Sequence, residues 1–263
     1  MNEFSFESYG VKIRVECSSN AVCDTAFAVV NKALLGRKIP IDRDEAEHVF
    51  TLRTDGNRFF MHLDGNDLGD GDSEFIFFKY FDTRIRILVA EYAVGYVFMH
   101  AGVVAWNGKL IIFPANSYSG KTTLVAEFVK KGAVYYSDEY AVIDQDGYVH
   151  PFPRLLAMRD RNGNYEKTEV SAESLGGNIG LDPMPISLVL LTRYKPRARW
   201  APKVLTSGVG VMKMISQAIS LRFRSKLTLE VLNKVASNAI IAESLRNSTE
   251  NSVNKIIEFV DNL

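Results

Sequence analysis

The chain has 263 residues, of which 47% are hydrophobic, and its 31 basic and 31 acidic side chains give a formal net charge of zero. A chain of this length and apolar content can build a buried core, so general disorder is excluded. The balanced charge argues against a dedicated nucleic-acid binder, which usually carries a basic surplus. No window of about 18 apolar residues is free of charge, so the sequence predicts no transmembrane helix and no membrane partner.

The N-terminus and the cysteines indicate the compartment. The first residues include an acidic side chain and lack the apolar stretch of a signal peptide. Two cysteines, Cys17 and Cys23, are too few for a disulfide framework. We therefore expect a cytoplasmic protein in which both thiols are free.

Residues 1–82 are expected to form a small N-terminal α+β subdomain that is rich in strands. Residues 11–15 alternate apolar and charged side chains, which is the period of a half-buried strand. Residues 48–53 and 58–63 have the pattern of a hairpin, with turn-forming residues between them. Residues 64–73 are expected to be a solvated acidic loop. A calcium site is the alternative, but the acids match the spacing of an EF-hand loop poorly.

Residues 83–263 alternate strands and helices, which predicts an α/β domain. Asp82 is a plausible N-cap for a helix that continues to about residue 98. Asn107-Gly108 is a strong hairpin signal, and Gly132 is placed to end the helix that follows. The other expected elements are strands at 101–106, 109–113, 133–136, 186–192 and 238–244, and helices at 121–131, 205–236 and from 248 onward.

The segment at residues 113–124 resembles the phosphate loop GxxxxGK[ST], with Ala115 in place of the first glycine. Small residues let consecutive backbone N–H groups face a polyphosphate, and the helix that follows favours an anion at its N-terminus. A lysine would meet the β- and γ-phosphates, and a hydroxyl would hold magnesium. The alternative is a strand–turn–helix junction that matches the pattern by chance. The residues expected to contact the nucleotide are Asn116, Ser117, Tyr118, Ser119, Gly120, Lys121, Thr122 and Thr123.

A phosphate loop needs a carboxylate near the metal, usually from the end of a neighbouring strand. Asp138 and Glu139 follow the strand expected at 133–136 and could supply it; the alternative is a solvated acidic turn. His100 lies between the expected long helix and the hairpin that leads to the loop. In isolation such a histidine is more often a packed structural residue. The other histidines, His48, His62 and His150, are expected to be structural or surface groups.

The order and spacing of these motifs resemble the catalytic domain of HPr kinase/phosphorylase. The resemblance is dense over roughly residues 97–160 and is greatest to the shorter HPr-kinase-related serine kinases found beside modified-peptide biosynthesis genes, including lasso-peptide tailoring kinases. It implies an α/β fold with a P-loop kinase core of the phosphoenolpyruvate-carboxykinase-like type.

The resemblance also implies roles for individual residues. Asp138 matches the general base toward a serine hydroxyl, Glu139 the second acid near the metal, and His100 the histidine beside the base, which would orient Asp138 or tune its pKa. Gly120, Lys121 and Thr122 match the nucleotide loop, with Thr122 and Glu139 as the implied metal ligands. Arg154 and Arg159 resemble basic residues that face phosphate or substrate, although a surface salt bridge explains them nearly as well.

The implied activity is an ATP- and Mg²⁺-dependent kinase that phosphorylates a serine on a peptide or small protein. Ala115, and Thr123 where the bifunctional enzymes carry a glutamate, argue against phosphorylase activity more than against kinase activity. A nucleotide-binding sensor without turnover and a small-molecule kinase are the alternatives. The sequence does not distinguish ATP from GTP, and homo-oligomerisation stays open.

Overall fold

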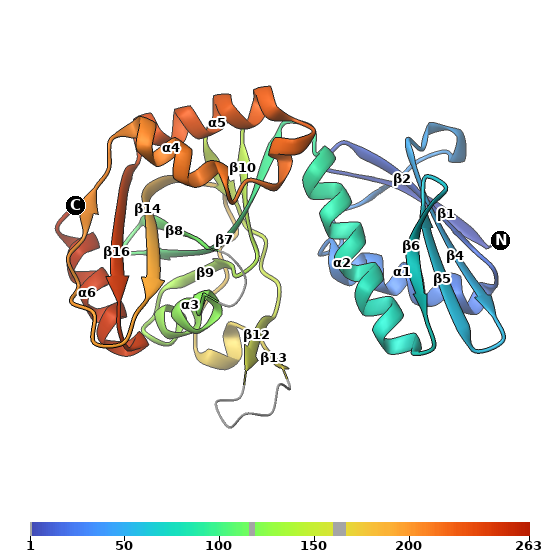
Figure 1. Cartoon of the computed structure of the whole chain (residues 1–263), viewed down its shortest axis with the longest axis horizontal. Coiled ribbons are helices and arrows are strands. Elements are labelled where there is room, and N and C mark those ends of the chain that lie inside the picture. The colour runs from blue at the N-terminus through green and yellow to red at the C-terminus, as the bar shows by residue number, and fades with distance from the viewer. Residues whose placement is uncertain (1, 116–118, 160–166) are drawn as a thin grey trace. The chain divides into compact units, whose positions relative to one another are not determined.

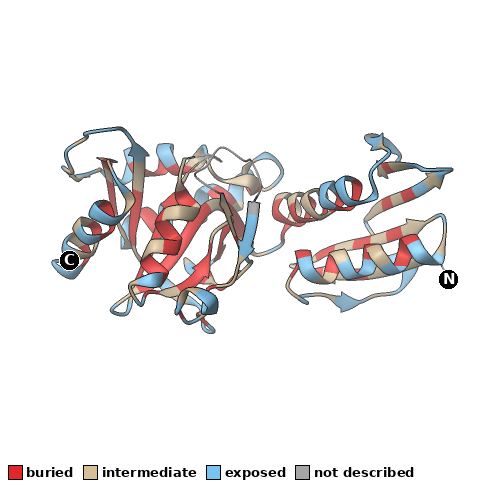
Figure 2. Ribbon diagram, turned by 90° about the horizontal axis from the view of Figure 1, so that it is seen from below, coloured by how far each residue is buried: buried red, intermediate tan, exposed pale blue. Residues whose placement is uncertain are grey.

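The computed structural model describes residues 2–115, 119–159 and 167–263, and it divides into two compact units, Met1–Gly95 and Tyr96–Leu263 (Figure 1). Buried side chains concentrate on the strands and on the inward faces of the helices in each unit (Figure 2). No helix in the described part of the chain is both long and apolar enough to cross a bilayer.

The N-terminal unit is a six-stranded sheet in the order β3-β1-β2-β4-β5-β6. The β2–β4 pair is parallel and the other pairs are antiparallel. Two helices, α1 and α2, pack against each other on the sheet. The elements are β1 (Glu3–Ser8), β2 (Val11–Cys17), α1 (Asn20–Ala33), β3 (Ile39–Pro40), the 3₁₀ turn η1 (Arg43–Glu45), β4 (His48–Asp55), β5 (Arg58–Leu63), β6 (Asn66–Gly71) and α2 (Glu74–Tyr92).

The structure confirms the strand expected at 11–15 and the hairpin of 48–53 with 58–63. It contradicts the loop expected at 64–73, because most of that segment is strand β6, which pairs with β5. Asp64 and Gly65 both have positive φ and form the tight turn that brings β6 back along β5. Helix α1 was not expected. Cys17 and Cys23 are free, as expected.

The helix expected from Asp82 begins earlier and ends earlier. Ser73 is its N-cap and accepts a hydrogen bond from the Ile76 backbone, whereas Asp82 lies inside the helix and pairs with Arg86 at 2.7 Å. The chain leaves the helix at Ala93 and starts strand β7 at Tyr96. The boundary between the units therefore falls after Gly95 and not between residues 82 and 83, since α2 packs on the N-terminal sheet.

The C-terminal unit is a mixed α/β domain around an eight-stranded sheet, in the order β11-β10-β7-β8-β14-β16-β15, with β9 also paired to β7. Its strands are β7 (Tyr96–Trp106), β8 (Lys109–Pro114), β9 (Val134–Ser137), β10 (Tyr140–Asp144), β11 (Tyr148–His150), β14 (Met184–Tyr194), β15 (Lys203–Val204) and β16 (Ile240–Arg246), and a separate hairpin is formed by β12 (Leu156–Arg159) and β13 (Lys167–Val170). Strands β8, β9 and β14 belong to one sheet, as the sequence predicted.

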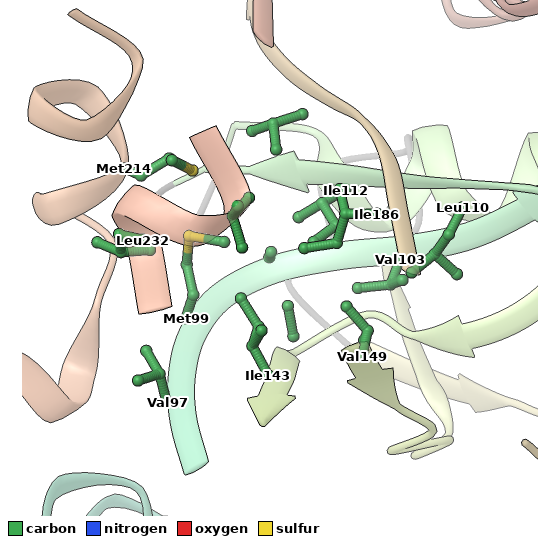
Figure 3. Packing of buried hydrophobic residues seen from close by; sticks show 14 of the residues in the cluster. Val97, Met99, Val103, Leu110, Ile112, Ile143, Val149, Ile186, Met214 and Leu232 are labelled. Carbon is green, nitrogen blue, oxygen red and sulfur yellow. The ribbon is translucent and has the colours of Figure 1, made fainter. Parts of the chain in front are cut away.

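Helices cover both faces of this sheet. The core on one face includes side chains of α4 and α5, and the core on the other includes side chains of α3 and α6. Figure 3 shows the first of these cores, where Met214 of α4 and Leu232 of α5 lie close to Met99 of β7. The helices are α3 (Lys121–Lys130), α4 (Ser207–Ile215), α5 (Ser225–Asn238) and α6 (Thr249–Asp261), with 3₁₀ turns η2 (Glu173–Leu175) and η3 (Ile219–Arg222). The single helical region expected at 205–236 is thus two helices joined through η3.

The directions of the strands decide where their ends meet. Strands β8, β14 and β16 are parallel, and both β8 and β9 run antiparallel to β7. The carboxyl ends of β8, β9, β14 and β16 therefore lie at the same edge of the sheet, which is where ligands bind in open α/β sheets.

We expect Phe128→Ala to lower the free energy of unfolding by about 3–5 kcal/mol. Phe128 is fully buried in α3, and its ring lies 5.5 Å from that of Phe113 on β8, so the truncation leaves a cavity between helix and sheet. Urea denaturation measures the loss. Phe223→Ala, at a partly exposed ring, is the matched control and should cost about 1 kcal/mol or less. Equal losses for the two variants would contradict this packing.

Candidate active site

The phosphate-loop motif lies at the carboxyl end of β8 and runs into α3. Gly120 is the N-cap of α3 and has a left-handed backbone, with φ 79° and ψ 22°. The N–H groups of the first turn, which starts at Lys121, have no acceptor within the helix and face out from its N-terminus. Ser119, Gly120 and Lys121 are described here, whereas the expected contacts of Asn116, Ser117 and Tyr118 lie outside the described residues.

Lys121 is buried, with 8% of its surface exposed, and its Nζ lies 3.0 Å from Nε2 of His100 on β7. The approach of α3 to β7 depends on Gly102, where a Cβ would lie 2.5 Å from Val125 and 3.1 Å from Cγ of Lys121. Burial lowers the pKa of Lys121, and the negative charges of Asp138 and Glu139 oppose that shift. A neutral His100 can accept a hydrogen bond from the Lys121 ammonium.

Asp138 follows β9 at the same sheet edge and is partly buried. Its Oδ1 is buried and has no hydrogen-bond partner among the described residues. Burial raises the pKa of Asp138 to about 6, and the charge of Glu139 adds to the rise. A hydrogen bond from the Thr122 side chain and the charge of Lys121 act in the opposite direction. The structure therefore brings together Lys121, Thr122 and Asp138, three of the residues singled out from the sequence.

Glu139, the residue after Asp138, forms an ion pair with Arg154, in which Nε and Oε2 are 3.3 Å apart. The backbone N–H of Glu139 donates to Oγ of Ser137, which is fully buried at the end of β9. Arg154 thus joins the site through Glu139. The backbone of Arg159 ends β12, but its side chain lies outside the described part of the chain.

Two of the other histidines form pairs with carboxylates. His48 pairs with Asp64 in the N-terminal unit, and His150 pairs with Asp144 beside β10. The contact shown for His100 is with Lys121, whereas the sequence suggested an effect on Asp138.

A divalent metal would have few protein ligands here. No group of three His, Cys, Asp or Glu side chains with metal-binding geometry occurs among the residues that the structure describes. Magnesium commonly takes one or two carboxylates and completes its shell with water and phosphate oxygens. The Thr122 hydroxyl and the acid pair Asp138–Glu139 fit that kind of site, because Thr122 and Glu139 both act on the Asp138 carboxyl and so lie beside it.

A cavity of about 740 Å³ opens at the carboxyl ends of β8, β14 and β16, beside the end of α4. Pro114, the last residue before the phosphate loop, lines it, and so does Gln217, whose carbonyl accepts from the His100 backbone at 2.8 Å. Three cationic side chains, Arg193, Lys203 and Lys213, also line it, and Lys213 pairs with Glu243. The cavity thus borders the phosphate loop and is suited to an anionic ligand.

The sequence did not single out Arg246, which the structure places against the loop, or Gln217, which accepts a hydrogen bond from the His100 backbone. Arg246 ends β16 and donates from Nη2 to the Ser119 carbonyl at 2.7 Å. Gln217 lies between α4 and η3. A basic residue at the end of the strand expected at 238–244, just before a helix, was a signal that could have drawn attention to Arg246.

Neither protein-family models nor curated proteins match the chain. Among solved structures, the HPr(Ser) kinase/phosphatase from Coxiella burnetii is similar, with a TM-score of 0.33 and 10% sequence identity. The match covers 63% of this chain and 94% of that protein. A similarity of this size does not assign the chain to a family. The α/β class predicted from the sequence is confirmed by the strands and helices themselves, and the HPr-kinase-like type stays a prediction.

We expect Asp138→Asn to stabilise the protein at high pH in metal-free buffer. The pKa of this carboxyl group is 3.8 in its ordinary state and about 6 in the fold, because the fold disfavours the ionised form. Its contribution to the free energy of unfolding is therefore complete below pH 3.8 and is lost as the pH rises through 6. Asparagine cannot ionise, so the free energy of unfolding of the variant should exceed that of the parent by about 1–3 kcal/mol in the range from pH 5 to pH 8. The difference should be larger at pH 8 than at pH 5. Urea denaturation at both pH values measures it.

The matched control is Glu230→Gln, at an exposed carboxylate of α5. Its stability relative to the parent should not change with pH over this range. If Asp138→Asn behaved in the same way, the Asp138 carboxyl would not be desolvated.

Proposed function

We propose that the protein is an ATP- and Mg²⁺-dependent kinase that transfers a phosphoryl group to a serine hydroxyl of a peptide or small protein. The observation that carries the proposal is that a phosphate-loop lysine and a buried carboxylate interact electrostatically at one edge of the sheet: Lys121 begins α3, and Asp138 follows β9 with an Oδ1 that has no hydrogen-bond partner among the described residues. Phosphoryl transfer depends mainly on positioning and on charge neutralisation, and these two groups meet those needs.

Lys121 and the first turn of α3 would bind the β- and γ-phosphates. His100 accepts from Lys121, so we assign it the role of holding the lysine in place. Thr122 and Glu139 would hold magnesium, which supplies positive charge against the phosphate oxygens when bound. Arg154 keeps Glu139 in position through their ion pair.

Asp138 would accept the proton of the serine hydroxyl as the serine oxygen bonds to the γ-phosphorus and ADP leaves. A base must lie within hydrogen-bond reach of the proton that it removes, and Oδ1 of Asp138, which has no hydrogen-bond partner among the described residues, would take that contact. The acceptor would approach at the carboxyl edge of the sheet, where Asp138 and the loop meet.

The cavity beside α4 favours a second candidate, a kinase acting on a small anionic molecule. Its volume of about 740 Å³ and its cationic lining suit such an acceptor as well as a nucleotide or an acidic peptide segment. Mass spectrometry of the phosphorylated product separates the two candidates. Nucleotide binding without transfer to any acceptor would instead favour a sensor module.

We expect Lys121→Ala to weaken binding of Mg·ATP by roughly 10- to 100-fold, because it removes a charged hydrogen-bond donor from the phosphates. Isothermal titration calorimetry measures the affinity. Lys130→Ala, at the other end of α3, is the control and should bind as the parent does. Equal affinity of the parent and the Lys121 variant would remove the loop from nucleotide binding.

Asp138→Asn should leave nucleotide affinity within a few fold, since the amide keeps the shape of the side chain and the loop is intact. If Asp138 is the base, the single-turnover transfer rate should fall by roughly 10²–10⁴-fold at every magnesium concentration. If it is chiefly a metal ligand, excess magnesium should restore part of the rate. Glu127→Gln on α3 is the control, and transfer by Asp138→Asn at the parental rate would exclude Asp138 from the reaction.

A further inference from the structure

Arg246 lies at the carboxyl edge of the sheet although its position in sequence is far from the phosphate loop. Strand β16 lies beside β14 (Figure 1) and pairs with it in parallel. In this register Arg246 is opposite Tyr194. Only 3% of its surface is exposed, and its guanidinium carbon lies 5.9 Å from the centre of the Tyr194 ring. A full side chain with a delocalised charge is thus buried in the domain.

The guanidinium is in direct contact with the phosphate loop. Nη2 donates to the Ser119 carbonyl at 2.7 Å, and a Cβ on Gly120 would lie 2.6 Å from the same nitrogen. Glycine at position 120 therefore serves two purposes: it adopts the left-handed N-cap backbone and leaves room for Arg246. No other residue type meets both conditions without displacing the arginine.

The charge of Arg246 has no counter-ion among the described residues. Burial lowers its pKa, and among the described residues only an electrostatic interaction with Tyr194 opposes the shift. Its Nε is buried, as is Oγ of Ser119 in the loop that it touches, and neither atom has a hydrogen-bond partner in the part of the chain that the structure describes. Burying an unpaired charge is costly, so a position of this kind is explained best by a ligand that completes it.

We propose that Arg246 is a phosphate-binding residue, and that the phosphate chain of a nucleotide held by the loop supplies its missing counter-ion. The inference rests on the proposed nucleotide binding and adds to it a cation from the end of β16. The guanidinium fork suits phosphate oxygens, and its contact with Ser119 already holds it against the loop. A purely structural role, in which the arginine only braces the loop, is the competing explanation.

Two variants separate these roles. Arg246→Met keeps most of the side-chain volume without the charge, and Arg246→Lys keeps the charge without the fork. Lys130→Met is the matched control, because it removes a positive charge from the exposed far end of α3. The melting temperature of each full-length protein is measured without ligand, with Mg·ATP and with pyrophosphate, and the affinity for Mg·ATP is measured by calorimetry.

The ligand role predicts that Arg246→Met melts without ligand at or above the parental temperature, since an uncompensated buried charge is gone. It also predicts that Mg·ATP and pyrophosphate no longer raise its melting temperature as they do for the parent. Affinity for Mg·ATP should fall roughly 10- to 100-fold in Arg246→Met and by less in Arg246→Lys. Lys130→Met should match the parent in every measurement.

Other outcomes overturn the inference in distinct ways. If the parent binds Mg·ATP and both Arg246 variants bind it equally well, Arg246 is not a phosphate ligand, although the proposed function stands. If Arg246→Met loses stability without ligand and Arg246→Lys retains both stability and full affinity, the bracing role is correct. If the parent itself binds neither Mg·ATP nor pyrophosphate, the proposed nucleotide binding fails first.

Discussion

The close approach of α3 to β7 is the packing contact on which the site depends. It requires a glycine at position 102, because any Cβ there would overlap Val125 and press on the stem of Lys121. This approach seats the lysine in a buried position and brings its Nζ to His100. A helix that stood farther from the strand would leave Lys121 in water, where it would lie farther from His100 and the Asp138 carboxylate.

The sheet then collects the remaining groups at one edge. The register of β7 places Ala101 opposite Pro114 and Val103 opposite Ser137, so the loop and the acid pair leave the sheet close to His100. The bond from the His100 backbone to Gln217 adds the end of α4, and thereby the cavity, to the same edge. Segments widely separated in sequence thus meet because four strands end on the same side.

Local sequence patterns were sufficient for the parts of the fold that depend on local interactions. The hairpin at Asn107-Gly108 and the glycine end of α3 at Gly132 follow from backbone preferences of those residues, and both were predicted. Strand β6 was missed because it has little apolar patterning and is specified by its turn and its pairing with β5. Arg246 was missed because its role depends on β16 lying beside β14, an order that a crossover through α4 and α5 decides.

The site contains one acidic group and one basic group whose interactions are incomplete among the described residues. On one side, Oδ1 of Asp138 is a buried acceptor with no donor in the described part of the chain, and desolvation raises the pKa of the Asp138 carboxyl. On the other, Arg246 is a buried cation without a carboxylate among the described residues. The two groups cannot neutralise each other, because the charges that act on Asp138 are those of Lys121 and Glu139. A nucleotide phosphate chain would supply the anion that Arg246 lacks, and a cation held beside Asp138 by Thr122 and Glu139 would favour the ionised form of that carboxyl.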